Sequence, residues 1–389
     1  MRLIYLFMSK GPAPTGSIRN CDLNQPCSSG YTDNSTGLYT EGYFYLLKRM
    51  LDHGIIDDLL VFYESNRGYG RANWGHGIQG YVVPEIRFVD KFIKPGDIIY
   101  ARGGFRTWFE WLKSKKKDGH WLINYSANTG RQKWTIWDIV FWDLNEIYDL
   151  DRHGRLWYYF VKPIHPMFKL DPNIEPIYDF CIGASHIHDK KGQWRTIEVL
   201  KEYQKMYHWR KPKCVLPGSI MRGTETRKIQ ENIKRYNLDV TLTGMLPRSK
   251  MCSEVYNKSK IFVHLGTHGQ NDRGPLEAFA CGNIIILGSS SYHSPILYKE
   301  NRHICDVVED LNNYKNIASL MFNERVLWSK ELRNKSSLYF KKSCDIETRI
   351  IPDMKRLFGF IRENFKPSME VKKELLRKIK DETTGGNIW

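Results

Sequence analysis

Short apolar runs alternate with amphipathic segments along almost the whole chain, and this alternation restricts the possible folds more than any other feature. The runs at residues 2–8, 59–63 and 284–287 have the length of single buried strands. Residues 38–52 repeat apolar side chains with helical spacing. Strands that alternate with helices build parallel sheets covered by helices. The sequence therefore predicts an α/β protein.

The length of the chain and two prolines near its middle predict two domains. A chain of 389 residues exceeds one ordinary core. Pro163 and Pro166 interrupt the alternating pattern where a second series of strands and helices begins. We expect one Rossmann-like domain at residues 1–165 and another at 166–350. Residues 351–389 are expected to form a helical tail that packs back on the N-terminal domain.

The chain is basic, with 59 Lys and Arg against 43 Asp and Glu and a formal net charge of +16. Residues 1–180 hold 22 basic and 20 acidic residues, so most of the excess lies in the second half of the sequence. A surplus of this size predicts a polyanionic partner or several bound phosphates.

The sequence predicts neither a membrane span nor a metal site. No apolar run reaches the roughly 18 residues that a membrane-spanning helix needs, and the first strand is too short for the apolar part of a signal peptide. The eight cysteines show no metal-ligand spacing and are expected to be free thiols. We therefore expect a soluble, cytoplasmic protein, located in the host cytoplasm if its source is viral.

The strongest local signal lies at residues 261–287, where a strand runs into a glycine-bearing loop and the loop enters a helix at Gly274 and Pro275. Proline suits the first turn of a helix, where its missing amide donor is not needed. The unpaired amides and the positive end of such a helix bind a diphosphate well. Leu276 and Glu277 follow in the first turn, and the carboxylate of Glu277 can accept hydrogen bonds from a pair of ribose hydroxyls.

The run from Gly274 to Gly282, GPLEAFACG, resembles the nucleotide-sugar signature of the retaining family 4 group of GT-B glycosyltransferases. In that family the last glutamate of the signature holds the ribose of the donor, a role that the resemblance assigns to Glu277. The resemblance implies two Rossmann-like domains facing across a cleft, with the acceptor on the N-terminal domain and the nucleotide sugar on the C-terminal one. It also implies a nucleoside diphosphate sugar as donor, a UDP-sugar in our interpretation, with no required metal and with retention of the anomeric configuration.

Other landmarks of the family occur in the expected order. The Lys-Gly pair after the strand at 178–182 resembles the diphosphate-binding opening of the donor domain, which assigns this role to Lys191 with Lys190 beside it. Gly244 and Met245 match the segment that borders the nucleobase. In the first domain, Thr36 and Gly37 match the glycine loop that approaches the donor.

The chain also departs from the family pattern. The first acid of the signature would fall near Gly269 or Gln270, and Asp272 is the nearest carboxylate, which makes it a candidate catalytic residue together with Lys191. Arg195 and Arg222 are candidates for the arginine that the family has after its donor strand. Arg102 follows the strand at 98–100, at an edge where α/β sheets bind ligands, and is a third catalytic candidate.

These features predict a glycosyltransferase that moves a sugar from a nucleoside diphosphate to an acceptor hydroxyl. We favour a hydroxymethylated pyrimidine in duplex DNA as acceptor, as in phage-type DNA glycosyltransferases, because the chain is basic and its first half is rich in tryptophan. The alternative is a cell-envelope or capsule polysaccharide enzyme at the inner membrane face, acting on a glycan or lipid-linked acceptor.

In that alternative the aromatic and lysine-rich segment 108–121 would be a membrane-surface helix, and in a DNA-binding enzyme it would contact nucleic acid, but we favour a core helix with a solvated lysine face. A further alternative is a non-catalytic nucleic-acid-binding protein that keeps the same fold.

Overall fold

The chain divides into two compact units, which are described separately. Unit 1 comprises Met1–His165 and Ile346–Trp389, and unit 2 comprises Pro166–Asp345. The computed structural model describes residues 1–8, 42–64, 70–73, 78–102, 106–125, 134–143, 147–183, 186–187, 191–220, 224–266, 273–288, 297 and 304–384. Among these residues, no helix is long and apolar enough to cross a membrane.

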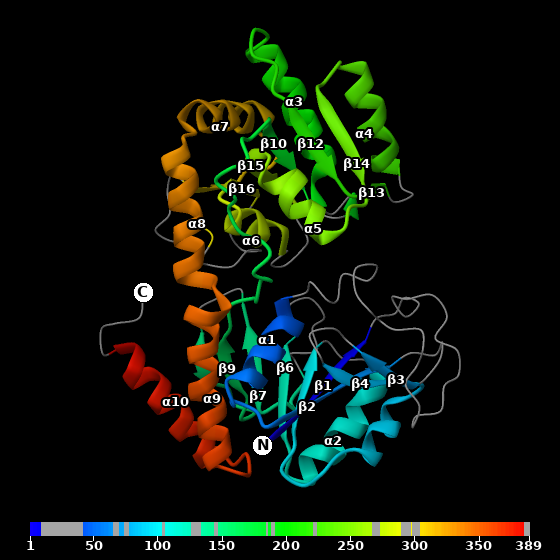
Figure 1. The fold of residues 1–389 in the computed structure, drawn as a ribbon, viewed down its shortest axis with the longest axis vertical. Coiled ribbons are helices and arrows are strands. Elements are labelled where there is room, and N and C mark those ends of the chain that lie inside the picture. Colours follow the sequence, from blue (N-terminus) through cyan, green and yellow to red (C-terminus); the bar gives the residue numbers. More distant parts are fainter. Residues whose placement is uncertain are drawn as a thin grey trace. The chain divides into compact units, whose positions relative to one another are not determined.

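Unit 1 is built on a sheet in which nine strands can be described (Figure 1). In chain order they are β1 (Arg2–Met8), β2 (Asp58–Glu64), β3 (Gly70–Asn73), β4 (Gln79–Val83), β5 (Ile98–Arg102), β6 (Trp121–Tyr125), β7 (Ile139–Trp142), β8 (Tyr148–Leu150) and β9 (Leu156–Tyr159). Their order across the sheet is β3-β4-β2-β1-β5-β6-β7-β9-β8. The two edge strands, β3 and β8, run antiparallel to their neighbours, and the seven between them are parallel.

The strands at the centre of this sheet confirm the predictions for residues 2–8, 59–63 and 98–100. The short outer strands β3, β8 and β9 were not predicted, since they are three or four residues long. Strands of that length leave no apolar alternation to recognise and depend on the pairing with their neighbours.

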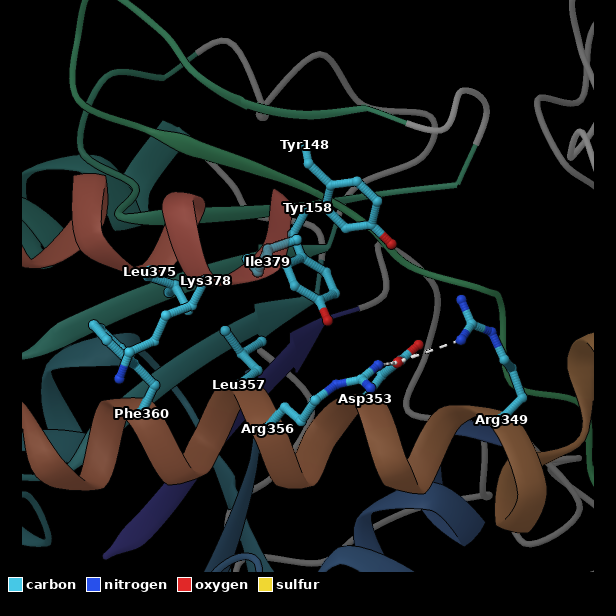
Figure 2. Close-up of a pocket in the computed structure, with 10 residues that line it drawn as sticks. All are labelled: Tyr148, Tyr158, Arg349, Asp353, Arg356, Leu357, Phe360, Leu375, Lys378 and Ile379. Atoms are coloured by element: carbon cyan, nitrogen blue, oxygen red, sulfur yellow. Dashed lines mark hydrogen bonds and ion pairs between the residues drawn. The ribbon is translucent and has the colours of Figure 1, made fainter. Parts of the chain in front are cut away.

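The tail returns to unit 1 as a π-helical turn, η8 (Ile346–Ile350), followed by α9 (Ile351–Glu363) and α10 (Met369–Thr384). Side chains from η8, α9, α10, β8 and β9 line a cavity of about 60 Å³, in which Arg349 and Arg356 both pair with Asp353 (Figure 2). Elsewhere on α10, the ammonium of Lys372 lies 2.9 Å from the buried carboxylate of Asp138. This buried ion pair attaches α10 to the sheet, because separating it would leave a buried charge without a partner.

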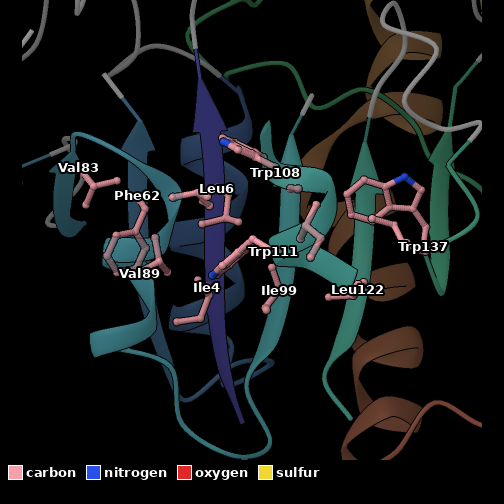
Figure 3. Packing of buried hydrophobic residues seen from close by; sticks show 14 of the residues in the cluster. Ile4, Leu6, Phe62, Val83, Val89, Ile99, Trp108, Trp111, Leu122 and Trp137 are labelled. Atoms are coloured by element: carbon pink, nitrogen blue, oxygen red, sulfur yellow. The ribbon is translucent and has the colours of Figure 1, made fainter. Parts of the chain in front are cut away.

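The aromatic residues after β5 belong to the core of unit 1. They lie on η2 (Arg106–Trp108) and α2 (Phe109–Lys117), and Trp108, Trp111 and Leu112 are 0%, 6% and 0% exposed. These side chains pack on β1, β5 and β6 in a single hydrophobic cluster (Figure 3). The segment is therefore a core helix with lysines on its outer face, and the interpretation of 108–121 as a membrane-surface helix is wrong.

The remaining helices of unit 1 that the structure describes are α1 (Gly42–Asp52), which begins inside the predicted range 38–52, and the short η1 (Ile86–Lys91). The apolar face of α1 is buried, with Phe44, Leu46 and Leu47 all 2% exposed or less. The apolar periodicity of the sequence therefore identified the face of α1 that packs on the sheet.

Unit 2 contains a sheet whose six described strands are all parallel. They are β10 (Tyr178–Ile182), β12 (Cys214–Pro217), β14 (Val240–Gly244), β15 (Ser259–His264), β16 (Ile284–Gly288) and β17 (Cys305–Val308). Its described helices include α3 (Gln193–Met206), α4 (Thr224–Arg235), α6 (Arg273–Ala280), α7 (Tyr314–Leu327) and α8 (Lys330–Cys344), and a small ladder pairs β11 (His186–Ile187) with β13 (Ser219–Ile220).

The strand order β14-β12-β10-β15-β16-β17 contains a topological switch point. From β10 the chain proceeds to β12 and β14 on one side, and then returns to β15, β16 and β17 on the other. In open α/β sheets, ligands bind at the carboxyl ends of the strands where this reversal occurs. In unit 2 that place lies between β10 and β15.

A buried acid on α7 gives unit 2 a pH-dependent stability. Glu324 is 8% exposed, and its burial, together with the neighbouring Asp306, raises the pKa of its carboxyl to about 7. The folded protein therefore holds a proton that the unfolded chain releases near pH 4.5, so this group lowers the stability as the pH rises from about 4.5 to 7.

Glu324→Gln is expected to remove this dependence, because an amide stays neutral. Between pH 5 and pH 8 the variant should gain about 2 kcal/mol in free energy of unfolding relative to the natural protein. Urea denaturation at the two pH values measures the gain, and an equal effect of the substitution at both would contradict the assignment.

Candidate functional site

The candidate site is centred on Glu277 of α6, whose side chain is buried and held by two partners. Its Oε1 accepts a hydrogen bond from Nη1 of Arg248 at 2.8 Å, and its Oε2 accepts one from the hydroxyl of Tyr256 at 3.3 Å. The side chain of Glu277 is 9% exposed and that of Arg248 is 21% exposed. One edge of the site therefore consists of a nearly buried carboxylate with an accessible guanidinium beside it.

Both partners of Glu277 come from the segment after β14. Arg248 begins the single turn α5 (Arg248–Lys250), and Tyr256 ends the π-helix η5 (Met251–Tyr256). Burial raises the pKa of Tyr256 well above its ordinary value, with the charge of Glu277 contributing, so this phenol remains a hydrogen-bond donor.

The helix that carries Glu277 begins close to its predicted start. Arg273 is its first residue, and Gly274, Pro275 and Leu276 follow in a buried first turn. At its other end, Gly282 has φ of +85° and the amide of Asn283 donates to the carbonyl of Ala278 at 3.0 Å. This left-handed glycine ends the helix.

Two loops meet at the switch point. Gly192, which precedes α3, has φ of +74°, and a Cβ on it would lie 2.2 Å from the carbonyl oxygen of Leu265. The loop after β10 is therefore in backbone contact with the loop after β15. This contact places Lys191, the candidate diphosphate ligand, one residue before the point at which the chain meets Leu265 and Gly266.

Arg195 strengthens the contact between these loops. Its Nη1 donates to the carbonyl of Leu265 at 2.9 Å, and its guanidinium lies 4.7 Å from the ring centroid of Trp194. Burial lowers the pKa of Arg195 from its ordinary value. The side chain of Arg195 therefore holds the loop after β15 through its carbonyl at Leu265. The second candidate for the family's arginine, Arg222, lies outside the described residues.

Gly244 and Met245 lie at the carboxyl end of β14, on the same edge of the sheet. Gly244 has φ of +68°, and its carbonyl accepts a hydrogen bond from the amide of Gly218 at 2.9 Å. Met245 is 64% exposed. Both residues therefore lie at the carboxyl edge of the sheet. Among the described residues, no hydrogen bond joins either of them to Glu277.

Arg248 was missed at the sequence level, although a signal for it exists. It is the basic residue that follows the end of β14 after the short run Met245–Leu246–Pro247. Because 29 positions separate it from Glu277, no local pattern predicts that the two side chains pair.

In addition to Arg222, four of the predicted site residues lie outside the described residues. They are Thr36, Gly37, Lys190 and Asp272. The structure therefore tests neither the donor loop of the first domain nor the candidate catalytic carboxylate.

Arg102 lies in unit 1, at the carboxyl end of β5, and its guanidinium stacks 4.4 Å from the ring centroid of Tyr43. Tyr125 lies nearby and donates a short hydrogen bond to the buried Asp143. Burial raises the pKa of Tyr43 and of Tyr125 well above the ordinary value, and the positive charge of Arg102 opposes that rise. Arg102 therefore belongs to a tyrosine cluster in unit 1, whereas Lys191 and Glu277 lie in unit 2.

In the part of the chain that the structure describes, no group of three or more His, Cys, Asp or Glu side chains is placed to hold a metal ion. The six cysteines described in this part, Cys181, Cys214, Cys252, Cys281, Cys305 and Cys344, are free.

Comparison with known proteins gives no match to a protein-family model and none to a curated protein sequence. Solved structures match over nearly the whole chain. A sucrose-phosphate synthase from Thermosynechococcus elongatus has a TM-score of 0.63 at 13% identity and covers 93% of this chain and 100% of its own. An α,α-trehalose 6-phosphate synthase from Burkholderia multivorans has a TM-score of 0.62 at 8% identity, with coverages of 98% and 99%.

HepE of Anabaena, solved in complex with UDP, is also similar, with a TM-score of 0.58, 12% identity and coverages of 93% and 100%. At such identities the similarity establishes the fold. The chain has the GT-B fold, with two Rossmann-like parallel-sheet units.

Proposed function

We propose that the protein is a glycosyltransferase that binds a nucleoside diphosphate sugar at the carboxyl edge of the sheet in unit 2. The observation that carries this proposal is the buried carboxylate of Glu277, held beside an accessible arginine at the topological switch point. The complex of the similar HepE with UDP supports a UDP-sugar as donor.

In this proposal different residues of unit 2 bind different parts of the donor. Glu277 accepts hydrogen bonds from the ribose hydroxyls, and the backbone N–H groups of Gly274 and Leu276, at the start of α6, face the diphosphate. Arg248 uses Nη1 to hold Glu277 and has further N–H groups for a phosphate oxygen. Lys191, with Lys190 beside it, adds positive charge.

The reaction breaks the bond between the anomeric carbon and the diphosphate oxygen and joins that carbon to the acceptor hydroxyl oxygen, whose proton is released. Negative charge develops on the departing diphosphate, and cations fixed around it lower the barrier by electrostatic stabilisation. Asp272 is the candidate carboxylate near the reacting carbon, and Arg102 is a candidate contact on the acceptor side. Retention of configuration, as in the family 4 resemblance, is part of the proposal.

Arg248→Gln is expected to weaken UDP binding by about 10- to 100-fold, because it removes a charged hydrogen bond to the diphosphate and the partner of Glu277. Uridine has no phosphate, so its affinity should fall much less. Calorimetric titration with both ligands measures the difference. Lys250→Gln, which changes an exposed cation on the same turn, is the matched control. Equal losses for UDP and uridine would remove Arg248 from the diphosphate site.

The charge of the two units supports a polyanionic acceptor. Unit 1 holds 31 Lys and Arg against 24 Asp and Glu, and unit 2 holds 28 against 19. The basic tail belongs to unit 1, so the acceptor-side unit is more basic than residues 1–180 alone suggest. This supports DNA carrying a hydroxymethylated pyrimidine as acceptor.

A membrane-associated glycan is the second candidate acceptor. It is supported by the exposed apolar side chains Trp209, Val326 and Leu327, which lie where α3 and α7 end. Mass spectrometry of products from a panel of nucleotide sugars, offered hydroxymethylated duplex DNA or lipid-linked glycans, distinguishes the two. Sugar added to DNA supports the first acceptor, and sugar added to the lipid-linked glycan supports the second. If no donor is transferred or hydrolysed, the enzymatic proposal is wrong and a non-catalytic role on this fold gains support.

A further inference from the structure

Exposed apolar side chains gather where α3 and α7 end. Trp209, three residues after α3, is 63% exposed, and Val326 and Leu327, the last residues of α7, are 54% and 60% exposed. Isolated exposed apolar residues are common on protein surfaces, but a cluster that includes tryptophan marks an interaction site.

Packing and hydrogen bonds join the two segments into one surface. The ring of Tyr207 stacks on that of Phe322, with a centroid distance of 4.0 Å and an interplanar angle of 7°. The ring of Trp209 lies 6.1 Å from that of Tyr207. In addition, Nη1 of Arg325 donates to the carbonyl of Arg210 at 3.2 Å. The Trp209 loop is therefore fixed beside the end of α7.

The same surface carries a surplus of positive charge. Arg210, Lys211 and Lys213 are exposed, and none of them forms an ion pair with an acid in the described ranges, although the ammonium of Lys213 lies 5.8 Å from the ring centroid of Tyr178. The nearby acid, Asp179, is already paired with Lys260 and Arg325, each at 2.9 Å. We call Trp209, Arg210, Lys211, Lys213, Val326 and Leu327 the Trp209 patch.

We propose that the Trp209 patch docks unit 2 onto an anionic lipid bilayer. The indole of Trp209 suits the headgroup region, and Val326 and Leu327 gain by leaving water for the acyl boundary. The three unpaired cations attract anionic headgroups. Nucleic acid fits less well, because it binds through aromatic stacking and two of the three exposed apolar side chains are aliphatic.

The position of the patch leaves the candidate donor site accessible. Tyr207 to Lys213 lead into the amino end of β12, and Asp179 lies at the amino end of β10. Glu277 and Lys191 lie after the carboxyl ends of β15 and β10, on the opposite edge of the same sheet. A bilayer bound at the amino edge therefore does not cover the carboxyl edge of unit 2.

This inference does not depend on sugar transfer, and co-sedimentation of the full chain with vesicles tests it. The natural protein should bind phosphatidylcholine vesicles that contain about 30% phosphatidylglycerol and bind pure phosphatidylcholine vesicles far less, since each cation near an anionic surface adds attraction. Trp209→Ser combined with Leu327→Ser should lower the partition coefficient about tenfold or more. Lys211→Gln combined with Lys213→Gln should also lower it and reduce its salt dependence.

A matched control variant shows whether a loss of vesicle binding is specific to the Trp209 patch. Leu338→Ser combined with Lys335→Gln removes one exposed leucine and one exposed lysine from α8 in the same unit, and should leave vesicle binding unchanged. Failure of the natural protein to bind anionic vesicles, or an equal loss in the control, would overturn the proposal. So would tighter binding to duplex DNA that the patch variants abolish. Glu277→Gln should bind vesicles normally, so a failure of the proposed donor site remains distinguishable.

Discussion

Glu277→Gln is expected to weaken UDP binding by about 10- to 100-fold, because hydrogen bonds to a charged group contribute about 1.5–3 kcal/mol. The amide keeps the size of the side chain but places an N–H donor where Arg248 or a ribose hydroxyl also donates. Isothermal titration with UDP measures the loss. Sugar transfer at subsaturating donor should fall by at least the same factor.

Glu254→Gln is the matched control for this experiment. Glu254 lies on η5, its side chain is 45% exposed, and it pairs with Lys250 at 3.7 Å. A surface pair of this kind contributes little, so UDP affinity should not change. If Glu277→Gln folds normally and binds UDP as tightly as the natural protein, the donor site does not lie at Glu277.

Gly192→Ala is the second substitution with a large expected effect. The backbone at Gly192 has φ of +74°, and the added Cβ would lie 2.2 Å from the carbonyl oxygen of Leu265, an atom that cannot move without its loop. Left-handed strain of about 1–2 kcal/mol and overpacking of about 1–3 kcal/mol add, so we expect a loss of about 3 kcal/mol in free energy of unfolding. The substitution would push the two loops apart and displace Lys191, so the affinity for UDP should fall as well.

Gly54→Ala separates strain from steric contact. Gly54 has φ of +64°, and a Cβ there would meet nothing within 4 Å. This variant should lose only the strain, about 1–2 kcal/mol, and should bind UDP normally. Urea denaturation and UDP titration of both variants provide the comparison. Equal losses of stability would show that the two loops at the switch point are not in close contact.

The strands at the centre of each sheet were predictable because most of their residues are apolar. Residues 284–287 fall within β16, and residues 178–182 coincide with β10, in which Asp179 is the one charged residue; a strand buried on both faces needs mostly apolar side chains. The start of α6 was predictable for a different reason, because Gly274 and Pro275 act on the backbone within a single turn.

The sequence favoured burial of the aromatic residues on α2 but did not decide it. Trp108 and Trp111 are followed by lysines at 113 and 115–117, a pattern that also fits a lipid-facing stripe, and only the sheet that covers the aromatic rings shows that they are buried. Conversely, nothing local distinguishes Trp209 from a core tryptophan. It is exposed because the loop after α3 turns at the edge of unit 2 and no other element packs over it among the described residues.

Local sequence was therefore sufficient for the α/β class, the alternation of strands and helices, and the start of the helix that carries Glu277. These features depend on apolar periodicity and on backbone preferences that act over a few residues. The pairing of Arg248 and Tyr256 with Glu277, and the contact of Gly192 with Leu265, depend on the order of the strands in the sheet. That order brings together residues that are 21 or more positions apart, so it is decided by packing of the whole unit.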